Sequence, residues 1–311
     1  MEYDMARTDL AVELNESISK KSGSLKGIIV NESTDSDAAI KVTEIKITNK
    51  RAAEAIGRPQ GSYITIEARN ISKAGESYRK KIVDILLDYI RKLLESNIEK
   101  QADANTTLLV VGLGNRCITS DSLGPLVVDG LEVDYHIQTG QGRDGGMCAV
   151  IPGVMADTGL ETADIIRGIA KQVKPSAVIA IDALAARNIS RLNTTIQLSD
   201  RGINPGSGVG NHRVGINKDN IGVPVLALGV PTVIDAFTIA VDLVSPLLKN
   251  CTKEEREEFL SRIYMEGISD MYVTPKAIDT DVQNISGVIS EALNQAVSYT
   301  HLRAHETGRN L

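Results

Sequence analysis

Residues 107–125, TLLVVGLGNRCITSDSLGP, decide how the rest of the chain is arranged. A run of apolar residues leads into a glycine turn and then to Asp121. That order is typical of a buried parallel strand with a carboxylate beyond its carboxyl end. A second stretch, AVIAIDALAAR at residues 177–187, leads to Asp182 in the same way. Because open α/β sheets bind ligands beyond the carboxyl ends of their strands, the two acids share one cleft if the strands are neighbours.

The segments around these strands predict an α/β fold. Period-two alternation indicates half-exposed antiparallel strands near the N-terminus, at residues 25–30, 40–47 and 62–68. Apolar residues at three-and-four spacing predict an amphipathic helix over residues 75–99. Further helices are expected at 123–131, 159–171, 233–249 and 275–296, and further strands at 147–153, 192–198 and 223–232. We therefore predict three layers: a mainly parallel, twisted sheet with helices on both faces, plus a small antiparallel β segment near the N-terminus.

Composition excludes several classes of protein. The 311 residues are 42% hydrophobic, enough for a sizeable core, and the net charge of −6 with dispersed Lys and Arg does not favour a nucleic-acid surface. Three well-separated cysteines without a C-x-x-C motif indicate free thiols in a reducing compartment and give no zinc framework. The chain has no standard export signal and no run of about 18 apolar residues, so a cytoplasmic protein without a membrane segment is expected.

The glycine turn has two interpretations. Gly112-Leu113-Gly114-Asn115 could open a dinucleotide-binding loop, but Cys117 stands where the third glycine of that motif belongs. A tight turn with backbone N–H groups facing the cleft is favoured, and these groups could hold an oxyanion. The glycine-rich loop at 204–213 can bring backbone close to a ligand in the same way. The candidate oxyanion positions are Gly112, Gly114, Asn115, Gly206 and Gly208.

Asp121 and Asp182 are the candidate catalytic residues. A single aspartate in such a place is as readily a helix cap, and Asp121 stands directly before a predicted helix. Two carboxylates in one partly dry cleft cannot both ionise easily, so one can hold a proton while the other deprotonates a water molecule. Other acids near predicted element ends, interpreted mostly as surface or capping residues, are Asp129, Asp157, Glu161, Asp164 and Asp235.

Nucleophilic and metal sites are poorly supported. Ser207 lacks the flanking glycines of a nucleophile elbow, and neither His136 nor His212 has triad context. Cys117 is interpreted as a small buried cysteine. His301 and His305 lack the glutamate of a zinc-protease motif. We expect neither a metal nor a cofactor.

The chain ends carry separate expectations. Composition alone favours a detachable or frayed arm for residues 1–22 over a core element. Residues 297–311 lack apolar periodicity and resemble translated adaptor or vector read-through, so they are interpreted as a non-native tail.

A set of motifs spread along the chain is similar to that of the germination protease family, spore endopeptidases of endospore-forming bacteria. The motifs are ARTDLAVE at 6–13, VVGLGN at 110–115, SDSLGP at 120–125, VIPGVM at 150–155, TGLETADII at 158–166, VIAIDALAAR at 178–187, NPGSGVGN at 204–211 and GVPTVIDA at 229–236. The resemblance implies an aspartate-dependent endopeptidase, without metal or cofactor, whose essential residues correspond to Asp121 and Asp182. It implies that small acid-soluble, DNA-protecting proteins of the spore core are degraded at germination.

The resemblance also implies a zymogen that removes its own N-terminus. Thr8 to Glu13 fits the family's processing sequence and places the cleaved bond between Asp9 and Leu10. The expected organisation is then a propeptide at 1–9 and a single peptidase domain at 10–296, assembled as a homotetramer. The family's fold is related to that of hydrogenase maturation endopeptidases.

Two alternatives remain open at this level. One is a hydrogenase-maturation type endopeptidase that recognises nickel on its substrate. The other is a non-catalytic, nucleotide-binding α/β module built on the glycine turn.

Overall fold

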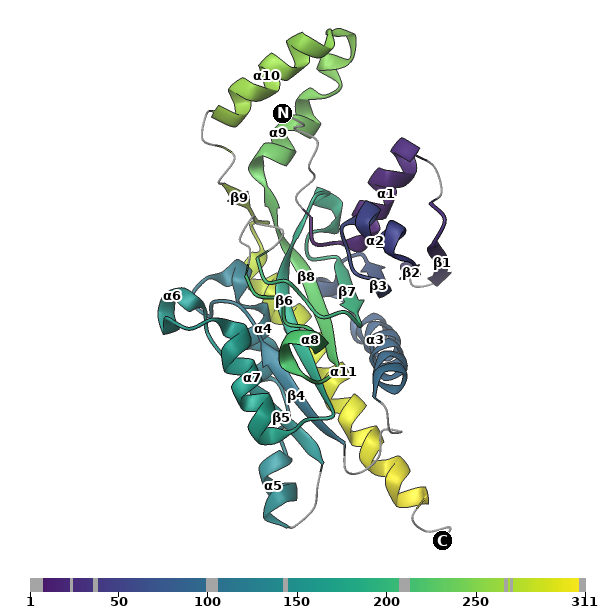
Figure 1. Ribbon diagram of the computed structural model, residues 1–311, viewed down its shortest axis with the longest axis vertical. Coiled ribbons are helices and arrows are strands. Elements are labelled where there is room, and N and C mark those ends of the chain that lie inside the picture. Colours follow the sequence, from purple (N-terminus) through teal and green to yellow (C-terminus); the bar gives the residue numbers. More distant parts are fainter. Residues whose placement is uncertain are drawn as a thin grey trace.

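The computed structural model describes residues 8–22, 25–35, 39–98, 106–141, 145–206, 213–265, 268 and 271–307. Within these segments, nine strands form one sheet in the order β1-β2-β3-β7-β8-β6-β4-β5, with β9 paired to β8 (Figure 1). The strands are β1 (Ile28–Asp35), β2 (Ile40–Ile47), β3 (Gly61–Ala68), β4 (Thr107–Gly112), β5 (Gly146–Val150), β6 (Ala177–Ala186), β7 (Thr195–Ser199), β8 (Val225–Asp235) and β9 (Tyr272–Val273).

The sheet is mixed, which corrects the prediction of a mainly parallel one. Parallel pairing is confined to β4 with β5, β4 with β6 and β6 with β8, whereas the other described neighbours run antiparallel. The N-terminal strands are antiparallel as predicted, but they continue the main sheet because β7 pairs with both β3 and β8. Alternation reports which face of a strand is buried, so it could not reveal this connection.

Helices cover both faces of the parallel strands, as predicted. Leu108 and Val110 of β4 face α3 (Glu76–Asn97), α4 (Leu123–Asp129) and α11 (Ile278–Thr307) in one apolar cluster. Leu109 and Val111 point the other way, toward α7 (Thr162–Val173) and α8 (Lys218–Ile221). Successive residues of a strand face opposite sides, so continuous apolar runs are required where both sides are covered. The helix predicted over 75–99 corresponds to α3.

The N-terminal segment belongs to the core, contrary to the expectation of a detachable arm. Leu10 is 0% exposed, and α1 (Ala11–Ser22) packs beside α2 (Lys50–Ile56) on the end of the sheet. The apolar patch at residues 10–12 covers Leu184 and Ala186 of β6. Composition does not reveal that a short polar segment is anchored when only a few of its residues are buried. Residues 1–7 lie outside the described part of the chain.

An extension formed by α9 (Ala236–Val244) and α10 (Lys253–Met265) projects from one end of the molecule (Figure 1, top). Its exposed apolar side chains include Leu243, Leu247 and Phe259. The short helices α5 (Tyr135–Gly140) and α6 (Met155–Thr158) lie outside this extension. α11 continues past residue 296, where the predicted helix ends. No helix among the described residues is long and apolar enough to cross a bilayer.

Candidate active site

The site forms where β4 stops and β6 continues. The pairing of β4 with β6 ends at Gly112 and Ile181, and the N–H of Leu113 donates to the carbonyl of Ile181. The next residue on β6 is Asp182, which therefore sits inside the strand and not at its end as predicted. On its other side β6 remains paired with β8 as far as Ala186. Because β4 ends before the level of Asp182, it leaves space beside the Asp182 side chain.

Asp121 lies in a short 3-10 turn, Thr119–Asp121, that follows the glycine turn. The backbone N–H of Asn115 donates to its Oδ2 at 2.7 Å. Gly114 has a φ of +106°, and a Cβ there would collide with the carbonyl oxygen of Asp121, so this approach requires glycine. The hydroxyl of Thr232 donates to Ser120 O at 2.6 Å and ties the turn to β8. Asp121 is not the cap of α4, a position that Ser122 occupies.

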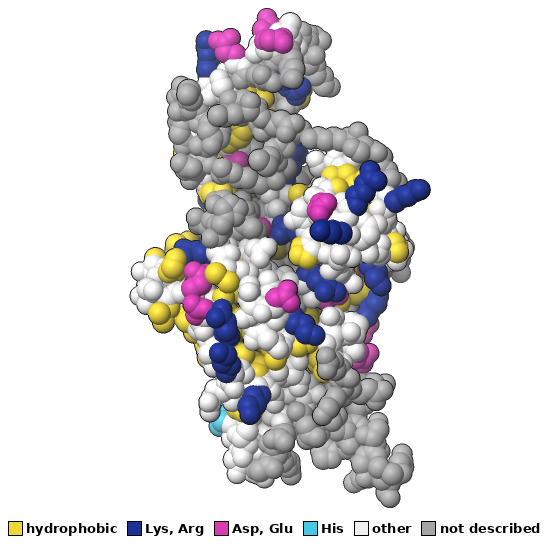
Figure 2. All heavy atoms as spheres, in the orientation of Figure 1, with side chains coloured by type: hydrophobic (Ala, Val, Ile, Leu, Met, Phe, Trp, Pro, Cys, Tyr) yellow, Lys and Arg dark blue, Asp and Glu magenta, His cyan; other side chains and the backbone are white. Residues whose placement is uncertain are grey.

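Both aspartates line one cavity of about 480 Å³. The cavity is bounded by the turns after β4, by the β5–α6 connection and by β6 and β8, with lining residues that include Leu113, Gly114, Ile118, Val154, Met155, Ala183, Leu184, Ala185, Thr232 and Tyr272. Near its rim, Met155 and Leu160 are exposed, and hydrophobic side chains gather at α6 in the space-filling view (Figure 2, left). The walls are thus largely apolar around two acids.

Burial raises the pKa of both carboxyl groups. For Asp121, removal from water raises the pKa and the hydrogen bond from Asn115 opposes the rise. For Asp182, which is 6% exposed, burial raises the pKa well above its ordinary value, and the charges of Asp121 and Asp9 raise it further. The N–H of Ala183 donates to Asp182 at 3.0 Å and opposes this. These shifts favour a protonated Asp182 beside a more readily ionised Asp121.

The predicted oxyanion positions occupy different places. Gly114 and Gly206 line the cavity, whereas Gly112 lies inside β4. The N–H of Asn115 is engaged by Asp121. Gly208 lies outside the described residues, as do Ser207 and His212.

The remaining candidates separate clearly. Glu161 lines the cavity. Asp235 caps α9 by accepting a hydrogen bond from the N–H of Thr238. The other three acids lie at the surface, where Asp129 pairs with Arg116, Asp164 pairs with Arg167 and Asp157 is exposed. Cys117 is exposed, which corrects the expectation of a buried cysteine. Its N–H donates to Asn115 Oδ1, which fixes this turn at the surface. His136 is exposed on α5.

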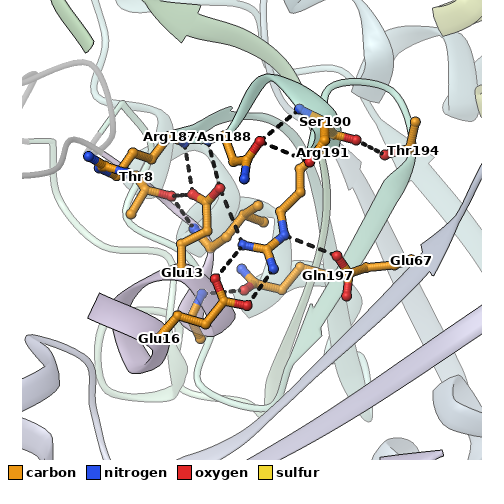
Figure 3. A network of polar contacts seen from close by, with 12 residues as sticks. Thr8, Glu13, Glu16, Glu67, Arg187, Asn188, Ser190, Arg191, Thr194 and Gln197 are labelled. Atoms are coloured by element: carbon orange, nitrogen blue, oxygen red, sulfur yellow. Dashed lines mark hydrogen bonds and ion pairs between the residues drawn. The ribbon is translucent and has the colours of Figure 1, made fainter. Parts of the chain in front are cut away.

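The N-terminal segment is held beside the cavity by a buried polar network (Figure 3). Glu13 accepts hydrogen bonds from the N–H groups of Arg187 and Asn188, both at 2.8 Å, and from the hydroxyl of Thr8. Arg191 lies 3.4 Å from Glu13 and also pairs with Glu16 and Glu67. A buried glutamate with this many donors fixes the first turn of α1 on the segment after β6.

Asp9 is the residue that sequence reasoning placed only at a cleavage site, and it lines the same cavity as Asp121 and Asp182. Its contacts with Arg58, Ala185 and Gln197 had no sequence signal, because these residues meet only in the folded chain. In the described part of the chain, no three His, Cys, Asp or Glu side chains converge to form a possible metal site.

Comparison with known proteins gives one consistent result. A family model described as germination protease matches residues 5–267. A germination protease of Caldanaerobacter subterraneus subsp. tengcongensis is 38% identical over 94% of this chain and 94% of its own length. One of Clostridium tetani is 37% identical over 94% of this chain and 95% of its own length. One of Bacillus subtilis is 44% identical over 83% of this chain and 71% of its own length.

Proposed function

Because this chain belongs to the germination protease family and is therefore a peptidase, we propose that it degrades small acid-soluble spore proteins in the spore core by a two-aspartate mechanism. The observation that carries the proposal is the convergence of Asp121 and Asp182 on one cavity, where burial raises the pKa of each. Family membership sets aside the non-catalytic nucleotide-binding alternative.

The two acids take different roles in this mechanism. Asp182 is the more deeply buried and holds the proton, while Asp121, with a backbone donor on Oδ2, carries the negative charge. Asp121 then orients and deprotonates a water molecule that attacks the peptide carbonyl, and Asp182 protonates the leaving amine. Gly114 and Gly206 line the cavity and are the backbone groups available to the developing oxyanion.

We also propose that the chain is made as a zymogen and cleaves itself between Asp9 and Leu10. Asp9 lines the cavity of the two aspartates, whereas Leu10 is fully buried against the core. Cleavage there would release the segment ending at Asp9 and keep α1, which Glu13 and Arg191 hold in place. An intact mass showing any other new N-terminus contradicts this part of the proposal.

Self-assembly into a homotetramer is proposed through the α9–α10 extension. This extension exposes Leu243, Leu247 and Phe259, and α9 buries few of its apolar residues in the described chain. Large apolar side chains exposed on one projecting element are typical of contact surfaces between subunits.

The direct test incubates the self-processed protein with a purified small acid-soluble spore protein. We expect endoproteolysis that is unaffected by a chelator and absent from an Asp182→Asn protein made to begin at Leu10, so that both proteins lack residues 1–9. Cleavage that requires added nickel would instead support the hydrogenase-maturation type of reaction.

A further inference from the structure

Beyond the end of β4, no strand in the described part of the chain pairs with this edge of β6, and Asp9 lies against it. The N–H of Asp9 donates to the carbonyl of Ala185 at 2.9 Å, and the N–H of Ala185 donates to Oδ2 of Asp9 at 3.0 Å. Asp9 thus contacts Ala185 through one main-chain bond and one side-chain bond, and the hydroxyl of Thr8 also donates to the carbonyl of Ala185. An extended chain that pairs with a free strand edge is a common way for proteins to bind peptides.

The carboxylate of Asp9 also meets a partly buried cation. Arg58 Nη2 lies 3.7 Å from Oδ1 of Asp9, and the two side chains are 16% and 12% exposed. The same Nη2 donates to the carbonyl of Thr8 at 3.1 Å. Gly57, in the left-handed conformation, ends α2 immediately before Arg58 and turns the chain toward this segment. Asp9 therefore separates the aspartate cavity from a smaller one, of about 150 Å³, that Arg58 lines.

Gln197 holds the main chain on both sides of the Asp9–Leu10 peptide bond. Its Nε2 donates to the carbonyl oxygen of Asp9 at 3.0 Å, and its Oε1 accepts from the N–H of Ala11 at 2.7 Å. Carbonyl, carboxylate and N–H of Asp9 all have defined partners. A site that satisfies every polar group of one residue type discriminates strongly against residues lacking those groups.

We propose that this seat, formed by Arg58, the N–H and C=O of Ala185, and the side-chain amide of Gln197, is the specificity site for an acidic residue preceding the cleaved bond. Asp9 fills it before self-processing, and acidic residues of protein substrates enter it after residues 1–9 leave. The inference rests on the proposed function, because it names residues that would select the cleaved bond.

A charge exchange in the full-length chain tests the seat. Asp9→Lys and Arg58→Glu each place like charges together, so each is expected to slow self-cleavage about tenfold or more. The double variant restores the pair with reversed charges and is expected to recover at least part of that rate. Arg79→Glu is the matched control: Arg79 pairs with Glu291, and neither residue lines the cavity, so the rate should be unchanged. Unchanged cleavage in Arg58→Glu would overturn the proposal.

A second measurement does not depend on activity. In the Asp182→Asn background, which is expected not to cleave itself, hydrogen exchange at residues 8–10 should accelerate in Arg58→Glu and in the milder Arg58→Gln, and slow again in the Asp9→Lys, Arg58→Glu double variant. Thermal melting verifies that each variant is folded. Protection that follows the charge pair, with no self-cleavage by the parent chain, would show that the seat binds Asp9 and would refute the proposed self-processing. Hydrogen-exchange protection of residues 8–10 that is the same with and without the Arg58 substitutions would refute the seat but not the proposed function.

Discussion

Asp121 and Asp182 come from separate elements, a turn after β4 and the middle of β6, and line the same cavity. Negative charge on Asp121 is one of the causes that raise the pKa of Asp182, after burial. The protonation of Asp182 therefore depends in part on the charge of Asp121. This coupling underlies the first two predictions.

Asp121→Asn and Asp182→Asn should each reduce peptide hydrolysis about 10²–10⁴-fold, the usual contribution of a positioned acid or base. Asparagine has nearly the same shape and can accept the hydrogen bonds from Asn115 and Ala183. The rate of cleavage of a small acid-soluble spore protein measures the effect. Asp129→Asn, on the exposed ion pair with Arg116, is the control and should keep the parent rate. Parent-like turnover in either cavity variant would exclude that aspartate from catalysis.

Asp182→Asn should also stabilise the fold at neutral pH, by about 1–3 kcal/mol. The pKa of Asp182 is raised in the folded protein, so the folded state keeps a proton that the unfolded chain releases near pH ~3.9. Stability of the parent therefore falls as pH rises from that value through the raised pKa, and the asparagine variant lacks this loss. Urea unfolding at several pH values measures the difference, which should shrink toward pH ~4. A difference that grows on acidification would contradict the assignment.

Glu13→Gln should loosen the N-terminal segment. The substitution removes the charge facing Arg191 and weakens acceptance from the N–H groups of Arg187 and Asn188, at a cost of about 1–3 kcal/mol. Limited proteolysis within residues 8–22 should accelerate. Glu16→Gln provides the comparison, because Glu16 pairs with the same Arg191 but its side chain is 46% exposed, so its loss should matter less. Equal effects of the two changes would mean that burial of Glu13 does not anchor α1.

Leu243→Lys should dissociate the proposed homotetramer. Leu243 is 71% exposed on α9, and a lysine there would place charge in an apolar contact between subunits. Sedimentation velocity measures the assembly. Ile137→Lys is the control, because Ile137 is also exposed but lies on α5, at the other end of the molecule from α9 (Figure 1). A tetramer that survives Leu243→Lys would place the interface elsewhere.

The sequence by itself determined the buried strands and the main helices, and it indicated two candidate aspartates. The apolar run that opens residues 107–125 forms β4, because a strand covered on both faces needs apolar residues throughout. Asp121 and Asp182 were identifiable since charged residues seldom follow such a run without a reason. Each of these signals lies within one short stretch of sequence, so it can be recognised without knowing which strands pair.

The tertiary structure decided which distant segments of the chain meet. β7 joins the N-terminal strands to the main sheet. The alternation of apolar and polar residues along a strand does not identify the strand with which it pairs. The seat of Asp9 likewise combines Arg58, Ala185 and Gln197 from three distant segments. Their contacts depend on where β4 ends and where α2 turns, and such long-range positions are fixed by packing of the whole chain.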